Sequence, residues 1–552
     1  MNLDSARESR IESKRSGREN HPPSGKEGEE HRFGNGIGPL DRFFADAILK
    51  RAGLHSEESA LALGRLMYRS RAGNLCVKKE DLGEAIESLP PTIVTEGNIL
   101  FPKAPIVRYK DCYYLQKNWV CETYILQHAL RLRRNPAPSY FDRNAFEENL
   151  SKFAEKLLPG QMAAMRAVLG QSLSLICGGP GTGKTYTAAH LVKLLSSSLK
   201  RQEKKDFRVC VAAPTGKAAS HLHAALQGQG CSDPALHIET FTLHRLLKLQ
   251  PGSNRLFTGG RIDADLIIVD EASMIDTLLL AHLLEAVGEE TLLVLIGDPD
   301  QLPPIEAGSL FAEMGALFGI ALEQCMRTED SHLQALAQAV KQGDFGKFSQ
   351  LLTPHSEPVS ADLLYSRIGP VFLSTPPDPR FCLETYSRFC ILNAIRQGPD
   401  GADALNTQIF QILQKKDKWW AAPILATVND SFCEIYNGMS GILIGQNKRV
   451  EAAYFPDPAT GEMRRFATPP PYELAFCLSI HKAQGSEFDE ILALFPKGSE
   501  HFGREALYTA ITRAKKNIEI RGEPETLQGM LLSTSRMVSS FSARALDFSA
   551  AS

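Results

Sequence analysis

The sequence lacks several features that mark special classes of protein. Its longest apolar runs, such as Leu292–Ile296, are far shorter than the ~18–20 residues of a transmembrane helix. The eleven cysteines form no C-x-x-C pair and mostly lie inside apolar runs, which predicts free thiols and no zinc or iron–sulfur site in a reducing cytoplasm. Basic and acidic residues nearly balance, at 61 and 64, so any nucleic-acid binding has to use a local patch.

The composition is that of an ordinary globular protein with several domains. The 552 residues are 43% hydrophobic and 23% charged, close to the average for folded proteins. Residues 1–37 alternate acids and bases with hardly any large apolar side chain, which excludes a secretory signal and predicts a disordered charged tail. Helix-like apolar spacing predicts a small helical domain over 38–135, followed by a linker that begins at Pro136.

Two further regions alternate short apolar runs with helical stretches, as parallel α/β sheets do. The first spans 136–360 and the second spans 361–552. Strands are expected over the most apolar runs: Leu173–Cys177, Val209–Ala213, Leu266–Val269, Leu292–Ile296, Phe389–Leu392 and Ile491–Leu494. Gly and Pro turns interrupt the second region over about 427–474, where we expect a small inserted β subdomain.

The strongest motif is a glycine-rich loop between an expected strand and an expected helix. It fits G-x-x-x-x-G-K-[ST], and its members are Gly178, Gly179, Pro180, Gly181, Thr182, Gly183, Lys184 and Thr185. In such a loop the backbone N–H groups point at phosphate oxygens beside a helix N-terminus. Lys184 then reaches the β- and γ-phosphates of ATP, and Thr185 offers a hydroxyl to Mg²⁺. A plain glycine-rich turn would not account for both flanking elements.

Two adjacent carboxylates follow the apolar run Leu266–Val269. Asp270 is expected to hold Mg²⁺, and Glu271 to polarise the attacking water as a general base. An acidic pair at a strand end is more often structural when it stands alone. A nucleotide hydrolase, however, needs both functions close to its phosphate loop, so the pair completes a predicted ATPase site.

A later expected strand runs into the sequence Gly-Asp-Pro-Asp-Gln-Leu-Pro-Pro, which begins at Gly297. This segment resembles motif III of the superfamily-one helicases. The other motifs of that superfamily occur in their usual order along the chain, at Gln161, 213–219, 242–247, 325–327, 479–488 and 508–515. The resemblance implies two RecA-like motor domains with a nucleotide cleft between them.

The same resemblance implies roles for residues around that cleft. Gln161 would read the adenine, and Glu487 would contribute to nucleotide binding. Arg327 and Arg513 would approach the γ-phosphate from the other wall of the cleft, with Arg513 as the arginine finger. Gln301 would link the cleft to the path of the DNA strand. Without the surrounding motifs, arginines at such positions are more often surface ion-pair residues.

Small polar and cationic side chains in these motifs suit contacts to phosphate and sugar that do not read bases. We expect single-stranded DNA to bind, independently of its sequence, at Thr215, Lys217, Thr242, His244, Ser479, His481 and Lys482. Ser479 stands where relatives usually have threonine, and it keeps the hydroxyl. The alternative for each residue is an ordinary turn or helix cap.

Longer matches narrow the resemblance to the RecD family, the alpha subunit of exodeoxyribonuclease V, over about residues 38–525. They comprise the phosphate loop, His481–Phe488, Arg396–Gly401 with Asn406, and Tyr436–Gly438. The family carries a β-hairpin pin, expected here at about 248–265, and an SH3-like subdomain, expected at about 427–474. Met439 stands where relatives commonly show an acidic residue.

The segment 38–135 resembles the domain by which RecD subunits dock into a three-subunit complex. The resemblance therefore implies an ATP- and Mg²⁺-dependent 5′-to-3′ translocase and helicase subunit, acting on single-stranded DNA and duplex ends in double-strand-break repair and recombination. A RecB-like nuclease–helicase and a RecC-like scaffold would be its partners. Two alternatives stay open: a stand-alone helicase of the same kind, and a nucleotide-switched clamp that binds DNA without unwinding it.

Overall fold

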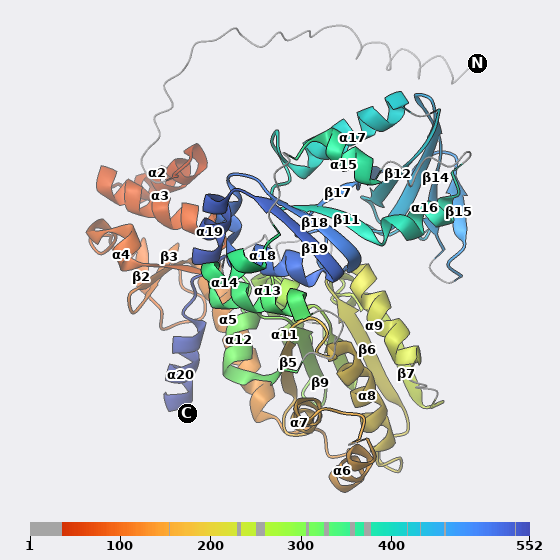
Figure 1. Ribbon diagram of the computed structural model, residues 1–552. Helices are drawn as coiled ribbons and strands as arrows, with labels where there is room; N and C mark the ends of the chain where they lie inside the picture. The colour runs from red at the N-terminus through yellow and green to blue at the C-terminus, as the bar shows by residue number, and fades with distance from the viewer. Residues whose placement is uncertain are drawn as a thin grey trace, which may run out of the picture.

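Four β-sheets organise the computed structural model (Figure 1). It describes residues 36–153, 155–228, 233–249, 260–304, 308–324, 331–353, 359–368, 377–416, 418–430, 432–457, 460–535 and 537–551. Nearly all of the expected charged tail, residues 250–259 of the expected pin, and Arg327 lie outside these ranges. Among the described residues, none of the helices has both the length and the apolarity needed to cross a membrane.

The N-terminal region combines helices with a small mixed sheet in the order β1-β4-β3-β2. Its elements are α2 (Pro39–Arg51), α3 (Glu57–Arg71), β1 (Cys76–Lys78), α4 (Lys79–Leu82), β2 (Val94–Glu96), β3 (Ile106–Tyr109), β4 (Cys112–Leu115) and α5 (Gln116–Arg134). The apolar spacing predicts only the helices. The sheet goes unpredicted because strands of three or four residues are too short to show alternation.

The first motor sheet is parallel throughout, in the order β10-β5-β9-β8-β6-β7. Its strands are β5 (Leu173–Gly178), β6 (Phe207–Ala213), β7 (Leu236–Thr242), β8 (Leu266–Val269), β9 (Leu292–Gly297) and β10 (Gly319–Leu322). Its helices are α6 (Arg143–Lys152), α7 (Pro159–Val168), α8 (Lys184–Ser197), α9 (Gly216–Gly228), α10 (Leu243–Leu246), α11 (Thr277–Ala286) and α12 (Phe311–Phe318). All four strands predicted for this region are confirmed, since helices on both faces require strands that are apolar on both sides.

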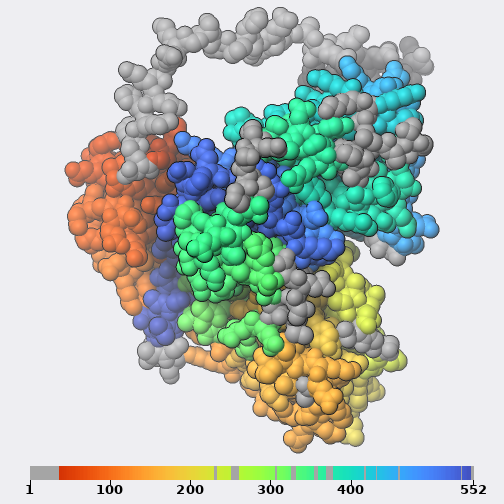
Figure 2. All heavy atoms as spheres, viewed as in Figure 1, coloured from red at the N-terminus to blue at the C-terminus, as the bar shows by residue number. Residues whose placement is uncertain are grey.

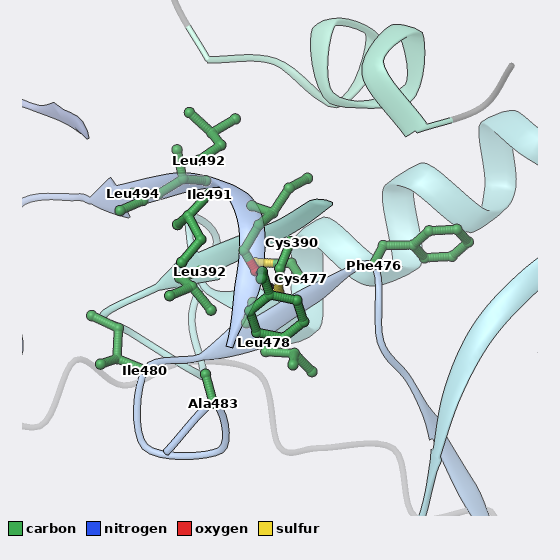
Figure 3. Packing of buried hydrophobic residues seen from close by; sticks show 14 of the residues in the cluster. Cys390, Leu392, Phe476, Cys477, Leu478, Ile480, Ala483, Ile491, Leu492 and Leu494 are labelled. Atoms are coloured by element: carbon green, nitrogen blue, oxygen red, sulfur yellow. Dashed lines mark hydrogen bonds between the residues drawn. The ribbon is translucent and has the colours of Figure 1, made fainter. Parts of the chain in front are cut away.

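The second motor sheet is also parallel, in the order β17-β11-β18-β19. Its strands are β11 (Phe389–Asn393), β17 (Cys477–Ser479), β18 (Phe488–Phe495) and β19 (Ala514–Gly522). Its helices are α13 (Ser331–Gln342), α14 (Phe345–Leu351), α15 (Ala361–Ile368), α16 (Pro379–Tyr386), α17 (Ala402–Lys416), α18 (Gly503–Thr512) and α19 (Pro524–Leu532). Figure 3 shows the core of this sheet, where Cys390 and Cys477 lie close together as buried free thiols. Helices α13 and α14 belong to this core, although the expected boundary between the two α/β regions, at residue 360, assigns them to the first.

A five-stranded antiparallel sheet is inserted between β11 and β17, in the order β15-β14-β13-β12-β16. Its strands are β12 (Trp419–Ala426), β13 (Ser440–Gln446), β14 (Arg449–Pro456), β15 (Met463–Phe466) and β16 (Tyr472–Leu474). The turn signals place its start near 427, whereas its first strand begins at Trp419. That strand is buried almost throughout, so its sequence does not distinguish a motor strand from a strand of the insertion.

The C-terminal helix α20 (Phe541–Ala551) leaves the second motor sheet and packs beside the N-terminal region (Figures 1 and 2). Backbone N–H groups of Leu75 and Cys76 donate to the Val538 carbonyl, at 3.0 and 3.2 Å. Arg544 forms a fully buried ion pair with Glu122 at 2.9 Å, and its guanidinium lies 3.7 Å from the Trp119 ring centroid. This contact fastens the N-terminal region to the end of the chain.

Replacing Arg544 with alanine should destabilise the fold by about 3–5 kcal/mol, because it leaves the Glu122 carboxylate buried without its counter-charge. Burial raises the pKa of Glu122, and the charge of Arg544 opposes that rise. Denaturant unfolding should show the loss. Asp547→Asn is the matched control on the same helix, since its ion pair with Lys110 is half exposed and should contribute at most about 1 kcal/mol. Equal losses in the two variants would contradict this account.

Candidate nucleotide site and strand groove

The glycine-rich loop connects β5 to α8, and its lysine forms hydrogen bonds with the carbonyls of the same loop. The Lys184 ammonium donates to the carbonyls of Gly178 and Gly179, at 2.7 and 3.0 Å. Gly183 has a positive φ of 79°, and a Cβ there would lie 2.5 Å from the Gln161 amide nitrogen. Only glycine fits at this position. Thr185, the residue after Lys184, is partly buried.

Gln161 lies on α7 beneath the loop, and its amide is engaged at both ends. Its nitrogen donates to the Thr182 carbonyl at 3.3 Å, and its oxygen accepts from the Leu158 N–H at 3.0 Å. The side chain is buried, with 3% of its surface exposed. In this geometry Gln161 positions the phosphate loop, and Glu487 lies apart from it, along the strand groove described below.

The predicted acidic pair lies at the end of β8, near the phosphate loop. Burial, together with the charge of Glu271, raises the pKa of Asp270 to about 6, and the charge of Lys184 acts in the opposite direction. Glu271 has a left-handed backbone with φ 51°, and its buried Oε2 has no hydrogen-bond partner among the described residues. A strained residue with an unpartnered carboxylate oxygen is typical of a functional site.

These residues fit a magnesium nucleotide. Mg²⁺ takes oxygen ligands and is held in nucleotide sites by one or two protein groups plus the phosphates, which the Thr185 hydroxyl and the Asp270 carboxylate could supply. The part of the chain that the structure describes contains no cluster of three or more His, Cys, Asp or Glu that could hold a metal ion.

A buried hydrogen-bond network joins the two motor sheets at the end of β9. The Tyr508 hydroxyl on α18 donates to Asp298 Oδ2 at 3.0 Å, and Gln301 donates to the same oxygen at 3.2 Å. The Leu302 N–H donates to Thr509 Oγ1 at 2.8 Å, and Gln484 donates to the Leu302 carbonyl at 2.7 Å. Burial raises the pKa of Tyr508, so its hydroxyl remains a donor. Sequence motifs contain these residues without indicating their pairing.

A cavity of about 820 Å³ lies between the two motor sheets, beside this network. Its first wall includes Gly178, Gly179, Pro180, Thr182, Asp298 and Asp300. The opposite wall includes Lys341, Tyr508, Thr512 and Lys515. Lys341 pairs with Asp300 at 2.6 Å. No motif marks Lys341, because it lies on an amphipathic helix whose exposed positions are ordinarily polar.

Arg513, the expected finger, is not among the residues that line the cavity. Its guanidinium donates to the Ser486 carbonyl at 3.3 Å and lies 3.5 Å from Thr512 Oγ1. The side chain is 3% exposed, and its Nε has no partner among the described residues. Arg513 therefore lies next to the cavity wall formed by Thr512 and Lys515 without lining the cavity itself.

A groove of about 550 Å³ collects most of the residues predicted to bind DNA. Thr215, Lys217, His481 and Lys482 line it, and the Lys217 ammonium donates to Ser486 Oγ at 2.8 Å. Ser479 lies beneath the groove, where its hydroxyl accepts from the Lys482 N–H at 3.4 Å. The structure adds lining residues that the motifs do not predict: Arg396, Thr427, Asn437 and Glu473. Three of them, Thr427, Asn437 and Glu473, come from the inserted sheet or its first turn.

Three of the predicted DNA residues have a different character from that expected. Burial lowers the pKa of His481 to about 4, so this side chain is neutral at pH 7 and can act only as a hydrogen-bonding group. Thr242 ends β7 and His244 is exposed on α10. Neither lines the groove, so the structure does not bring all seven residues to one surface.

Replacing Gln301 with alanine should lower strand-stimulated ATPase about tenfold and the basal rate much less, because a buried hydrogen bond to Asp298 is lost between cavity and groove. Steady-state ATPase with and without a thymidine oligonucleotide measures both rates. Gln342→Ala, exposed at the end of α13, is the control. Equal losses of both rates would restrict Gln301 to a local role in the cleft.

Fold and site together define a superfamily-one helicase, with two parallel motor sheets, a phosphate loop on the first, and a network that joins them. Residues 156–357 match the model of an AAA domain, and residues 474–518 match that of a UvrD-like helicase C-terminal domain. The RecBCD enzyme subunit RecD of Mycolicibacterium smegmatis is 30% identical over 89% of this chain and 94% of the relative. The chain belongs to the RecD family.

Other known proteins are similar to this chain over varying shares of their length. The RecBCD enzyme subunit RecD of Haemophilus influenzae is 24% identical, over 88% of this chain and 87% of that one. The ATP-dependent RecD2 DNA helicase of Deinococcus radiodurans is 28% identical over 67% of this chain but only 49% of its own. Among solved structures, the Pif1 helicase of Candida albicans is 17% identical, covers 72% of this chain and 99% of that one, and superposes with a TM-score of 0.43.

Proposed function

We propose that this protein is an ATP-driven 5′-to-3′ single-stranded DNA translocase and helicase subunit of a RecBCD-type helicase–nuclease, acting in double-strand-break repair and homologous recombination. The observation that carries the proposal is the buried network from Asp298 and Leu302 to Tyr508, Thr509 and Gln484. It ties the first motor sheet to the second between the nucleotide cavity and the groove, where a change on one side has to move the other.

Each residue at the cavity would then have a separate role in ATP hydrolysis. Lys184 exchanges its two backbone carbonyls for phosphate oxygens, and Thr185 and Asp270 hold Mg²⁺. Bound Mg²⁺ neutralises charge on the phosphates. Glu271, with its unpartnered carboxylate oxygen, orients and deprotonates the attacking water. Arg513 approaches from the second motor half as it closes, and Arg327, which lies outside the described residues, is proposed to act on the same phosphate.

The groove would hold the DNA backbone rather than its bases. Lys217 and Lys482 supply charge, while Thr215, Ser479 and neutral His481 supply hydrogen-bonding groups. Contacts of this kind bind strands of any sequence, as a translocase requires. Thr242 and His244, which do not line the groove, would contact the strand outside it.

RecB-like and RecC-like subunits would be the partners of this chain in the cytoplasm, and the N-terminal region would dock on them. That region exposes large apolar side chains on α2: Leu40 is 55% exposed and Phe43 71%. Its core is continuous with the first motor core, so deletion of residues 38–135 would also damage the motor. Serine substitutions at Leu40 and Phe43 are the sharper test, and they should reduce capture of the partners without changing ATPase.

The function is tested with the full chain and tailed DNA duplexes. We expect single strands to stimulate ATPase, and duplexes with a 5′ tail to be unwound in preference to those with a 3′ tail. ATPase that does not respond to DNA would favour the nucleotide-switched clamp. Purification from native cells as an active monomer would favour the stand-alone helicase.

A further inference from the structure

Glu473 is one of two acidic side chains, with Glu487, that line a groove otherwise suited to a polyanion. It lies on β16 of the inserted sheet, opposite Leu425 of β12, and lines the groove together with Lys217, His481 and Lys482. A carboxylate here opposes the binding of a phosphate backbone, since like charges repel. A reason for its presence is therefore needed.

The two oxygens of Glu473 face two different cations of the groove. The Lys482 ammonium donates a hydrogen bond to Oε1, and the Arg396 guanidinium lies 3.6 Å from Oε2. Arg396 also pairs with Asp403 at 3.3 Å, so it keeps a partner when it leaves Glu473. A carboxylate between two cations presents them with the same pair of charged oxygens as a backbone phosphate.

The three side chains are open enough for this arrangement to be exchanged. Their exposed fractions are 25% for Glu473, 33% for Lys482 and 52% for Arg396. Ion pairs at such exposure contribute little to folding, which leaves them free to break when a competing anion arrives. Sequence motifs predict Lys482 as a strand contact but assign nothing to Glu473.

We propose that Glu473 is an internal substitute for a DNA phosphate: it holds Lys482 and Arg396 in place while the groove is empty and yields them to the strand backbone when DNA binds. Arg396 is thereby a phosphate-binding residue of the groove. The inference rests on the proposed function, because it assumes that this groove holds single-stranded DNA. Competition from Glu473 weakens each bound state, and so speeds release of the strand, which a translocating motor needs at every step.

The test compares wild type with Glu473→Gln in the full chain, using a fluorescent thymidine oligonucleotide at several salt concentrations. Glutamine keeps the size of the side chain but removes its charge. We expect Glu473→Gln to bind the oligonucleotide about 3- to 30-fold more tightly, as expected for the release of two partly exposed ion pairs. The slope of log affinity against log salt should steepen by about 1, since freed cations release counterions when they meet phosphates.

Glu434→Gln is the matched control, because Glu434 pairs with Arg464 at 3.1 Å beside the same inserted sheet but outside the groove. It should bind as wild type does. Adding Arg396→Gln to Glu473→Gln should remove part of the gain. Weaker or unchanged binding by a folded Glu473→Gln, with the wild-type salt slope, would overturn the proposal and make Glu473 a positioning residue. If wild type itself binds no oligonucleotide, the proposed function fails instead.

Discussion

Replacing Lys184 with alanine should reduce ATP turnover to background while leaving oligonucleotide binding within about twofold of wild type. The ammonium is the cation at the phosphate loop, and without it the charge on the β- and γ-phosphates is not offset as the bond to the leaving group breaks. In the structure the ammonium donates to the Gly178 and Gly179 carbonyls, so it lies at the glycine-rich loop. The groove is lined by other residues, which is why strand binding should survive.

Lys193→Ala serves as the control for this variant. Lys193 is on the same helix, α8, but its side chain is exposed on the far side near the Phe153 ring. It should turn over ATP as wild type does, and both variants should show the wild-type far-UV circular dichroism. ATPase close to the wild-type rate in a folded Lys184→Ala protein would show that nucleotide is hydrolysed elsewhere.

The central strands of the motor sheets could be predicted because their burial on both faces leaves a clear mark. Runs such as Leu266–Val269 are apolar at every position, and a parallel sheet covered by helices demands that. The short strands of the N-terminal sheet carry no such mark. The strand Trp419–Ala426 carries the mark but pairs with the inserted sheet, because burial alone does not specify a partner strand.

The candidate site divides along similar lines. The phosphate loop is one continuous motif, and Asp270 and Glu271 directly follow a strand. Their chemical roles could therefore be predicted from the sequence. The pairing of Tyr508 with Asp298, and of Glu473 with Lys482 and Arg396, joins residues that only the fold brings together. The sequence shows that Tyr508 belongs to a helicase motif. Its hydrogen bond to Asp298 depends on how the two sheets meet, which the sequence does not show.

The orientation of the Arg513 side chain also could not be predicted from the sequence. A motif gives the position of the arginine at the end of α18, but the orientation of its guanidinium depends on the contacts that it makes in the folded chain. Here it is held by two long contacts, 3.3 and 3.5 Å, and its Nε has no partner. A buried cation with an unpartnered donor is stabilised by an anion that reaches it, and we propose the γ-phosphate as that anion.

Replacing Arg513 with alanine should therefore lower turnover by about 10³-fold or more, with only a modest loss of nucleotide affinity, since the contact forms mainly in the transition state. Single-turnover hydrolysis at saturating ATP, together with nucleotide affinity by fluorescence titration, separates the two effects. Lys515→Ala is the informative comparison, because Lys515 lines the cavity directly and its side chain is 47% exposed. If Lys515→Ala loses more turnover than Arg513→Ala, Lys515 is the finger; if Arg513→Ala abolishes binding but leaves the rate per bound ATP intact, Arg513 is a ground-state ligand.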